Sequence, residues 1–249
     1  MVCAFATSHR RLEAPVVRHA AWMALLAKLE PRTSSVVLIA GSPGSGRTHI
    51  LRRIGEAARM LEYTTVGCDD GLGIEPTTTL VDIHRILFAL LDSETEDAPA
   101  NRAGVPPGIV RRALGALRES VDYEQAIFGL LARAAPAVMA VDGCSPSPTL
   151  ADWFITRLIP HFRSSKAPLV LLVADRVEAL TWLRDTADEV IELGPLDLDE
   201  VGTHLRAIGR GMQQPLNDDE IRAYCEAVAG DLSLLTPLAE VLRVLAAER

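Results

Sequence analysis

Hydrophobic and polar positions along residues 13–195 form two kinds of stretch. Short apolar runs, rich in β-branched residues and bounded by turn residues, are typical of buried parallel strands. Longer stretches with one apolar stripe at helical spacing are typical of helices that pack on such a sheet. The strands are predicted at 35–40, 63–67, 137–141, 169–174 and 190–193. The helices are predicted at 13–30, 48–61, 79–91, 108–119 and 121–134. This alternation predicts an α/β fold with a mainly parallel sheet.

Two segments of this region follow neither pattern. Residues 69–76 are rich in turn residues and are expected to form a loop, and residues 92–107 mix acidic residues, Ala and Pro and are expected to form an exposed excursion. After Pro195 the pattern changes to helices alone. These helices are predicted at 198–209, 217–229 and 233–247. The sequence therefore predicts an α/β domain over 1–196 and a small all-helical subdomain over 197–249.

Composition describes a globular chain without a membrane segment. Of its 249 residues 49% are hydrophobic, which is enough to build a buried core. No apolar run reaches the roughly 18 residues that a membrane-spanning helix needs, so we expect no membrane insertion. Residues 1–11 lack the pattern of a secretion signal. The four cysteines are widely spaced, which argues against a zinc site or a disulfide framework and favours the cytoplasm.

Charge is unevenly distributed along the chain. The net charge is −8, but residues 1–60 carry nine basic and three acidic side chains. The C-terminal segment 197–249 has ten acidic and five basic side chains. An acidic body argues against direct binding of nucleic acid. The basic first segment is either a surface that faces phosphate or simply a solvated face.

The clearest motif follows the first predicted strand. Residues 41–48, Gly-Ser-Pro-Gly-Ser-Gly-Arg-Thr, fit the phosphate-binding loop G-x-x-x-x-G-K-[ST] except at Arg47. Glycines let backbone N–H groups converge on phosphate oxygens, and the helix that follows points its positive end at the same anion. The Thr48 hydroxyl is of the type that ligates Mg²⁺. The residues assigned to nucleotide binding here are Gly41, Ser42, Pro43, Gly44, Ser45, Gly46, Arg47, Thr48 and His49. The alternative is a Gly-rich turn that only joins a strand to a helix.

Arg47 stands where the motif has lysine. Its guanidinium keeps the positive charge but is broader and planar, whereas lysine offers a compact charge on a slim stem. Every basic residue except Lys28 and Lys166 is arginine, so the change fits either a tolerated drift or a deliberate loss of catalysis. We expect binding to survive the change better than hydrolysis does.

A second acidic motif follows the third predicted strand. The run at 137–141 leads into Asp142, and an Asp at the carboxyl end of a parallel strand lies at the edge where ligands bind. There it could hold Mg²⁺ through water, or it could simply cap the next turn. Hydrolysing P-loop proteins usually have an acidic residue next, where this chain has Gly143. Its absence predicts slow or absent hydrolysis.

Two arginines follow the fourth predicted strand. Arg176 comes just after the strand and is expected to sense a γ-phosphate from the sheet edge, which makes it the candidate catalytic residue. Arg184 lies further on and could act as an arginine finger toward a neighbouring subunit. Each could instead be an ordinary surface arginine.

The order of these elements resembles the AAA+-related ATPase domain of STAND-type signalling proteins, including those of large bacterial transcription regulators. Besides the loop, the resemblance is carried by Ile191-Glu192-Leu193-Gly194-Pro195-Leu196, where the last strand ends. It implies a P-loop NTPase parallel sheet sandwiched by helices, then a helical lid. Arg18 corresponds to an arginine near the nucleotide base, within a turn where Val17 replaces glycine. In the lid, Leu232 replaces a proline that helps to read the nucleotide.

The resemblance implies a regulatory switch that binds ATP or ADP with Mg²⁺ and has slow or absent hydrolysis. Such a switch controls signalling or assembly with a protein partner or effector chain, and could form nucleotide-dependent homo-oligomers. In this chain Mg²⁺ would be held by Thr48 and Asp142. A scaffold with an ATPase fold that binds no nucleotide is the first alternative, favoured by the four departures at Val17, Arg47, Gly143 and Leu232. An active ATPase domain of a transcription regulator is the second.

Overall fold

The computed structural model describes residues 18–69, 72–96, 122–194, 198–209 and 216–228, together with 234–235, 237–238 and 241–242. The helix predicted at 108–119, and most of the excursion predicted at 92–107, lie outside these residues. In the described part of the chain, no helix is both long enough and apolar enough to cross a membrane.

A six-stranded sheet forms the centre of the fold, and every pair of neighbouring strands is parallel. The strands are β1 (Ser35–Gly41), β2 (Thr64–Val66), β3 (Leu72–Ile74), β4 (Ala137–Cys144), β5 (Leu169–Asp175) and β6 (Glu189–Leu193). Their order across the sheet is β2-β4-β5-β1-β6, with β3 also paired to β4. The α/β fold class predicted from the sequence is confirmed. The order places β5 between β1 and β4, which a reading of the chain from end to end does not indicate.

Strand β3 corrects one expectation, because it lies in the segment 69–76 that was expected to be a loop. Both β2 and β3 pair with β4, at Thr64–Val66 and then at Leu72–Ile74, so they follow one another along the same strand. Gly67, between them, has φ 72°, and a Cβ there would lie 2.4 Å from the carbonyl oxygen of Ala140. A three-residue strand beside such a turn is too short to show a periodic pattern, which is why the sequence did not predict it.

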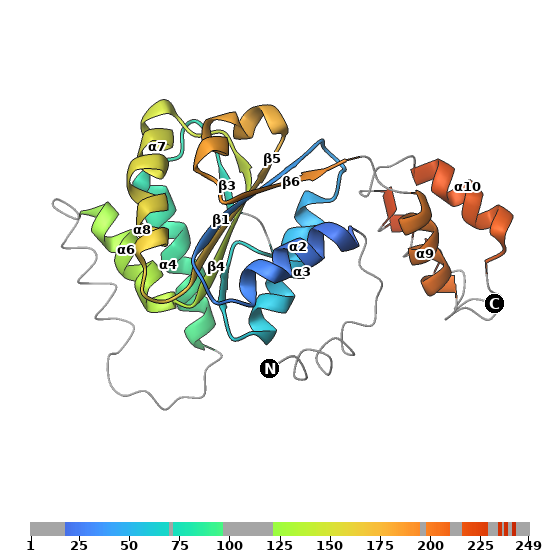
Figure 1. The fold of residues 1–249 in the computed structure, drawn as a ribbon, viewed down its shortest axis with the longest axis horizontal. Coiled ribbons are helices and arrows are strands. Elements are labelled where there is room, and N and C mark those ends of the chain that lie inside the picture. The colour runs from blue at the N-terminus through green and yellow to red at the C-terminus, as the bar shows by residue number, and fades with distance from the viewer. Residues whose placement is uncertain are drawn as a thin grey trace.

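Helices cover both faces of the sheet (Figure 1). On one face lie α2 (His19–Leu29) and α3 (Arg47–Met60); on the other lie α4 (Leu80–Glu96), α6 (Tyr123–Ala134), α7 (Pro148–Trp153) and α8 (Ile159–Ser164). A five-residue π-helix, η2 (Phe154–Leu158), joins α7 to α8, and a 3-10 helix, η3 (Val177–Thr186), follows β5. The helical stretch from Pro148 to Ser164 was not predicted from the sequence.

The sheet separates two hydrophobic cores. Along β1, Val36 and Leu38 pack with the helices on the α4 side, while Val37 and Ile39 pack with α2 and α3. Every residue of β1 and of β5 is buried, as expected of central parallel strands that are covered on both faces. The two central strands are therefore held rigidly, and so are the residues at their carboxyl ends.

Beyond β6 the described chain is helical. Helices α9 (Leu198–Gly209) and α10 (Asp218–Val228) begin and end within one residue of the predicted bounds. Their apolar sides share a small core of their own, which includes Val201, Leu205 and Ile221. The boundary between 196 and 197 stays a prediction, as does the single helix expected over 233–247.

Candidate functional site

The loop between β1 and α3 folds back tightly on itself. Gly44 and Gly46 have φ 78° and 95°, a conformation that other residues rarely adopt, and the N–H of Ser45 donates to the carbonyl of Ser42 at 3.1 Å. A Cβ on Gly41 would lie only 2.3 Å from the Ser45 Oγ. The backbone therefore favours glycine at Gly44 and Gly46, and the close approach of Ser45 favours it at Gly41.

Helix α3 directs its amino end into this loop. The residue that precedes the helix is Gly46, which has no side chain to accept hydrogen bonds from the first N–H groups. A helix of 14 residues concentrates positive potential at that end, and its first N–H groups have no partners within the helix. The Ser45 side chain beside it is 3% exposed, and no partner for its Oγ is present among the described residues. Free donors and a buried hydroxyl form a cradle suited to phosphate oxygens.

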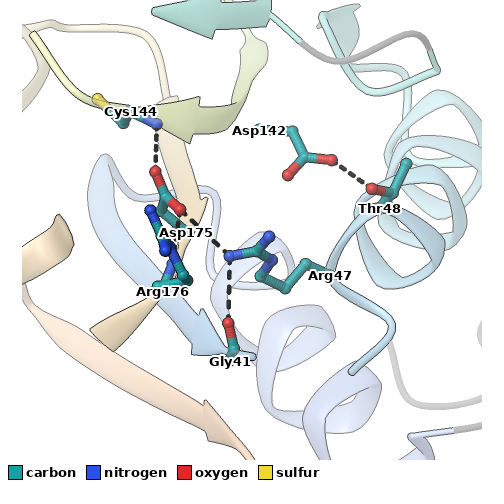
Figure 2. Close-up of polar contacts among 7 residues, drawn as sticks. All are labelled: Gly41, Arg47, Thr48, Asp142, Cys144, Asp175 and Arg176. Carbon is teal, nitrogen blue, oxygen red and sulfur yellow. Dashed lines mark hydrogen bonds and ion pairs between the residues drawn. The ribbon is translucent and has the colours of Figure 1, made fainter. Parts of the chain in front are cut away.

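Thr48 and Asp142 meet at this edge of the sheet. The Thr48 hydroxyl in the first turn of α3 donates a hydrogen bond to Asp142 Oδ2 on β4 (Figure 2). The strand continues past Asp142 to Cys144, so Asp142 lies within β4 and not after its end as the predicted bounds placed it. In the part of the chain that the structure describes, no three side chains of the types His, Cys, Asp and Glu lie together as a metal site. The hydroxyl and the carboxylate are hard oxygen donors of the kind that hold Mg²⁺ when phosphate oxygens complete its shell.

Arg47 lies on the other side of the same turn, against β5. Its Nη1 donates to the Gly41 carbonyl at 3.1 Å and to Asp175 Oδ1 at 3.2 Å. Asp175 is the last residue of β5 and is 7% exposed. Its carboxylate also accepts the N–H of Cys144 and the N–H of Arg176, both at 2.7 Å (Figure 2). Asp175 could not be recognised from the sequence as part of the site, because β5 can be placed beside the loop only once the strand order is known.

The expectation for Arg176 concerned its side chain, but its backbone is what contacts the site. Its N–H is hydrogen-bonded to Asp175 Oδ1, and the residue as a whole is exposed. Arg184, on η3, forms an exposed ion pair of 3.1 Å with Glu192. Neither the sensing role of Arg176 nor the finger role of Arg184 is tested by these contacts, and both stay predictions.

Arg18 connects the loop to the end of β6. The residue is 8% exposed, and its Nε donates to the Ser45 carbonyl at 2.9 Å while its Nη2 donates to the Gly194 carbonyl at 2.7 Å. Burial lowers the pKa of the Arg18 guanidinium, and the negative charge of Glu200 raises it. Two other positions of the family resemblance, Val17 beside Arg18 and Leu232 in the expected lid, lie outside the described residues.

Glu200, in the first turn of α9, continues this connection into the C-terminal helices. Its two carboxylate oxygens accept the backbone N–H groups of Arg18, at 3.2 Å, and of His19, at 3.3 Å. These N–H groups lie at the start of α2, where a carboxylate satisfies free donors and the helix dipole. The loop, the end of β6 and α9 are thus joined through one short segment.

His49 lies in the same first turn of α3, facing other basic groups. Burial is the main cause that lowers its pKa to about 4, and the positive charges of Arg53, His204 of α9 and Arg52 contribute to the same shift. Its Nε2 is buried and has no hydrogen-bond partner among the described residues. The imidazole is therefore neutral near neutral pH. A neutral His49 does not add positive charge to the phosphate loop.

Gly143 follows Asp142 in a conformation that disfavours a side chain. Its φ is 87°, and a Cβ built there would meet nothing within 4 Å. There is space for a larger residue, but the backbone is strained for any residue except glycine. No carboxylate projects from the position that follows Asp142.

No family model and no curated protein matches the sequence. Among solved structures, one similar chain is a Signal Transduction ATPase with Numerous Domains (STAND) protein with a tetratricopeptide repeat sensor from Pyrococcus horikoshii. It is 15% identical with a TM-score of 0.46, over 84% of this chain and 28% of that one. Another belongs to the HORMA:CdnC:Trip13 complex of E. coli MS115-1, at 16% identity and a TM-score of 0.42, over 78% of this chain and 59% of that one.

The chain thus spans less than two thirds of the length of either similar structure. Both similarity scores are low. The fold therefore rests on the parallel sheet and its covering helices, and any functional argument rests on the residues of the site itself.

Proposed function

We propose that this protein is a regulatory switch of the AAA+/STAND type that binds ATP or ADP with Mg²⁺ and hydrolyses it slowly or not at all. The observation that carries the proposal is the juxtaposition of a glycine loop, the free end of α3 and the Thr48–Asp142 contact at one edge of the sheet. Phosphates would lie in the loop from Gly41 to Thr48. Bound Mg²⁺ would supply a positive charge that neutralises the phosphates.

The proposal gives a task to the backbone at the start of α3 and to three side chains around it. The backbone N–H groups at the start of α3 would bind phosphate oxygens, since no side chain caps them. Thr48 would exchange its hydrogen bond with Asp142 for a contact to Mg²⁺, while Asp142 would hold the ion through water. Arg47 would supply positive charge toward the outer phosphates, in place of the usual lysine.

A switch needs a connection from the nucleotide to a part that can respond. Arg18 supports this requirement, because it contacts the loop carbonyl of Ser45 while its backbone N–H is bound by Glu200 of α9. A phosphate that moves the loop would therefore alter a contact to the C-terminal helices. We propose that their new position is read by a protein partner or effector chain, or by a second copy of this chain.

Slow or absent hydrolysis follows from the residue after Asp142. A general base must lie within hydrogen-bond reach of the attacking water, and Gly143 offers no such group. Restoring one by substitution alone is opposed by the backbone at φ 87°. Nucleotide exchange, and not turnover, would then set the state of the switch.

A second candidate is a scaffold that binds no nucleotide. It is favoured by the way the polar groups of the loop satisfy one another, since Thr48 is bonded to Asp142 and Arg47 to Asp175. In that case the loop would be a structural corner, and the protein would act only through its surfaces. Titration with nucleotide separates the two candidates.

The test is calorimetric titration of the folded protein with ATP and with ADP in the presence of Mg²⁺, with phosphate release measured in parallel. We expect saturable binding of both nucleotides and little phosphate release. Thr48→Ala and Asp142→Asn should each weaken binding by about ten- to a hundredfold, as losses around a metal site do.

Matched substitutions away from the loop control for general effects. Thr156 and Asp152 are exposed on the far helices, so Thr156→Ala and Asp152→Asn should leave the affinity unchanged. Absence of binding at millimolar nucleotide to a folded protein would reject the switch and leave the scaffold. Rapid phosphate release would instead favour a working ATPase.

A further inference from the structure

Asp175 is a buried carboxylate at the edge of the sheet where phosphate is proposed to bind, and the proposed function gives it no role. It lies at the end of β5, level with Ala40 of β1, and so between the loop and Asp142 of β4. Its oxygens accept two backbone N–H groups and the guanidinium of Arg47. A carboxylate in this place repels phosphate unless a cation neutralises it.

The Arg47–Asp175 ion pair is well shielded from water. The exposed fractions of the two side chains are 17% and 11%, whereas those of the surface pair Arg59–Asp69 are 41% and 57%. Charges interact more strongly where solvent does not screen them. Breaking such a pair on one side leaves an uncompensated buried charge, which is costly.

One nitrogen of Arg47 makes both of its contacts. Nη1 donates to Gly41 and to Asp175, and Figure 2 shows the rest of the guanidinium turned toward the side where Thr48 and Asp142 lie. The planar group is thus anchored at one end to the sheet edge. A lysine carries its three N–H donors on a single nitrogen, so it has no second nitrogen to extend toward phosphate while the first is held at Asp175.

The charge of Arg47 is also largely offset in this arrangement. The pair Arg47–Asp175 is neutral as a unit, so the loop has its backbone N–H groups but little net cationic charge to offer. The outer phosphates of a nucleotide carry the charge that would attract Arg47, and they must compete for it with a carboxylate at 3.2 Å.

We propose that Asp175 is the counter-charge that holds Arg47 at the sheet edge in the nucleotide-free chain, and that the outer phosphates of the nucleotide compete with it for Arg47. Asp175 therefore lowers the affinity of the site, and most of all for nucleotides with more phosphates. The inference rests on the proposed nucleotide binding at this loop. Asp175 acts through Arg47 and is a positioning residue.

The experiment is calorimetric titration of ATP, ADP and AMP with Mg²⁺ into the wild-type chain and Asp175→Asn. The asparagine keeps the shape of the side chain and one acceptor oxygen but removes the charge. We expect ATP affinity to rise on the order of tenfold, ADP affinity to rise less, and AMP affinity to stay nearly constant. In the background of Arg47→Ala the rise should vanish, since no cation remains to be released.

Asp69→Asn is the matched control, because it removes the carboxylate of an exposed arginine–aspartate pair and changes the net charge equally. It should leave all three affinities unchanged. Wild-type binding without a gain in Asp175→Asn, or an equal gain for AMP, overturns the inference alone. Failure of both proteins to bind any nucleotide rejects the proposed function, and the inference with it.

A second measurement needs no substitution and so does not depend on the variant folding. NMR of the wild-type chain with ¹³C-labelled aspartate reports the carboxyl carbon of Asp175, assigned from backbone correlations. Saturating ATP should shift this resonance more than AMP does, because only the outer phosphates draw on Arg47. If the protein binds ATP but this resonance does not change, the proposed competition between phosphate and Asp175 for Arg47 is contradicted.

Discussion

Two of the polar contacts that the first turn of α3 makes with the sheet differ in burial and in charge. Toward β4, Thr48 offers a neutral hydroxyl to Asp142, and both side chains are reached by solvent. Toward β5, Arg47 forms a largely buried ion pair with Asp175. Neighbouring residues of one helix thus face two very different environments.

Because of this difference, the Thr48–Asp142 contact is easily opened, whereas Arg47 is held firmly by Asp175. The Thr48–Asp142 contact costs little to open, since water can replace each partner. The Arg47–Asp175 pair cannot open without leaving a charge in a poorly hydrated place. In the proposed site, one side of the turn would receive Mg²⁺, and the other would set how strongly phosphate must attract Arg47 before its side chain moves.

The largest expected effect comes from breaking the buried ion pair between Arg47 and Asp175. Arg47→Ala removes the cation and leaves the Asp175 carboxylate uncompensated, so the free energy of unfolding should fall by about 3 kcal/mol. Arg59→Ala, which breaks the exposed pair with Asp69, should cost less than about 1 kcal/mol. Urea denaturation at neutral pH measures both. Equal losses of unfolding free energy in the two variants would mean that solvent screens both ion pairs equally, and the contrast between a buried and an exposed pair would be wrong.

A second effect concerns His49, the next residue of the same turn. Its pKa is lowered from 6.5 to about 4, mainly by burial and also by nearby positive charges, so the folded state disfavours its protonation. The contribution of neutral His49 to the free energy of unfolding is complete above the unfolded pKa near 6.5. It falls as the pH drops below that value and is fully lost below about 4. The loss from this residue should be about 2 kcal/mol between pH 7 and pH 5.

Denaturation of wild type and His49→Gln across this range measures the contribution of His49. As the pH falls from 7 to 5, the wild type should lose about 2 kcal/mol of stability relative to the variant, because glutamine does not titrate while the acidic groups contribute equally to both proteins. Curves that stay parallel would show that His49 titrates normally. The first turn would then be better hydrated than its contacts indicate.

The smallest effect concerns the residue after Asp142. Gly143→Glu places a side chain on a backbone with φ 87°, which should cost about 1 kcal/mol of stability. It should not increase phosphate release, since the strained backbone does not position the carboxylate. Gly129→Ala is the control: Gly129 lies exposed in α6 with open space around it, and alanine there should add about 0.5–1 kcal/mol. Faster phosphate release by Gly143→Glu would contradict the account of hydrolysis.

The sequence predicted the long elements of the fold well, because their patterns are local. Strand β1 was predicted over 35–40 and spans Ser35–Gly41, and α9 was predicted with the bounds that it has. Strand β3 was missed because three residues carry no period. The helical stretch from Pro148 to Ser164 was also missed, and its interruption by the π-helix η2 breaks a regular spacing.

The candidate site divides in the same way. Thr48 and Asp142 were each singled out from a local sequence pattern, and the structure brings their side chains into contact. Asp175 belongs to no local motif; it matters only because β5 lies between β1 and β4, which depends on the whole sheet. The contact of Arg18 with Ser45 and Gly194 likewise joins segments that only the folded chain brings together.

The most direct test is one titration of ATP with Mg²⁺ into three proteins under the same conditions: wild type, Thr48→Ala and Asp175→Asn. We expect opposite changes, with weaker binding when the Thr48 hydroxyl is removed and tighter binding when the Asp175 charge is removed. Changes in the same direction, or no binding by any of the three, would contradict this expectation.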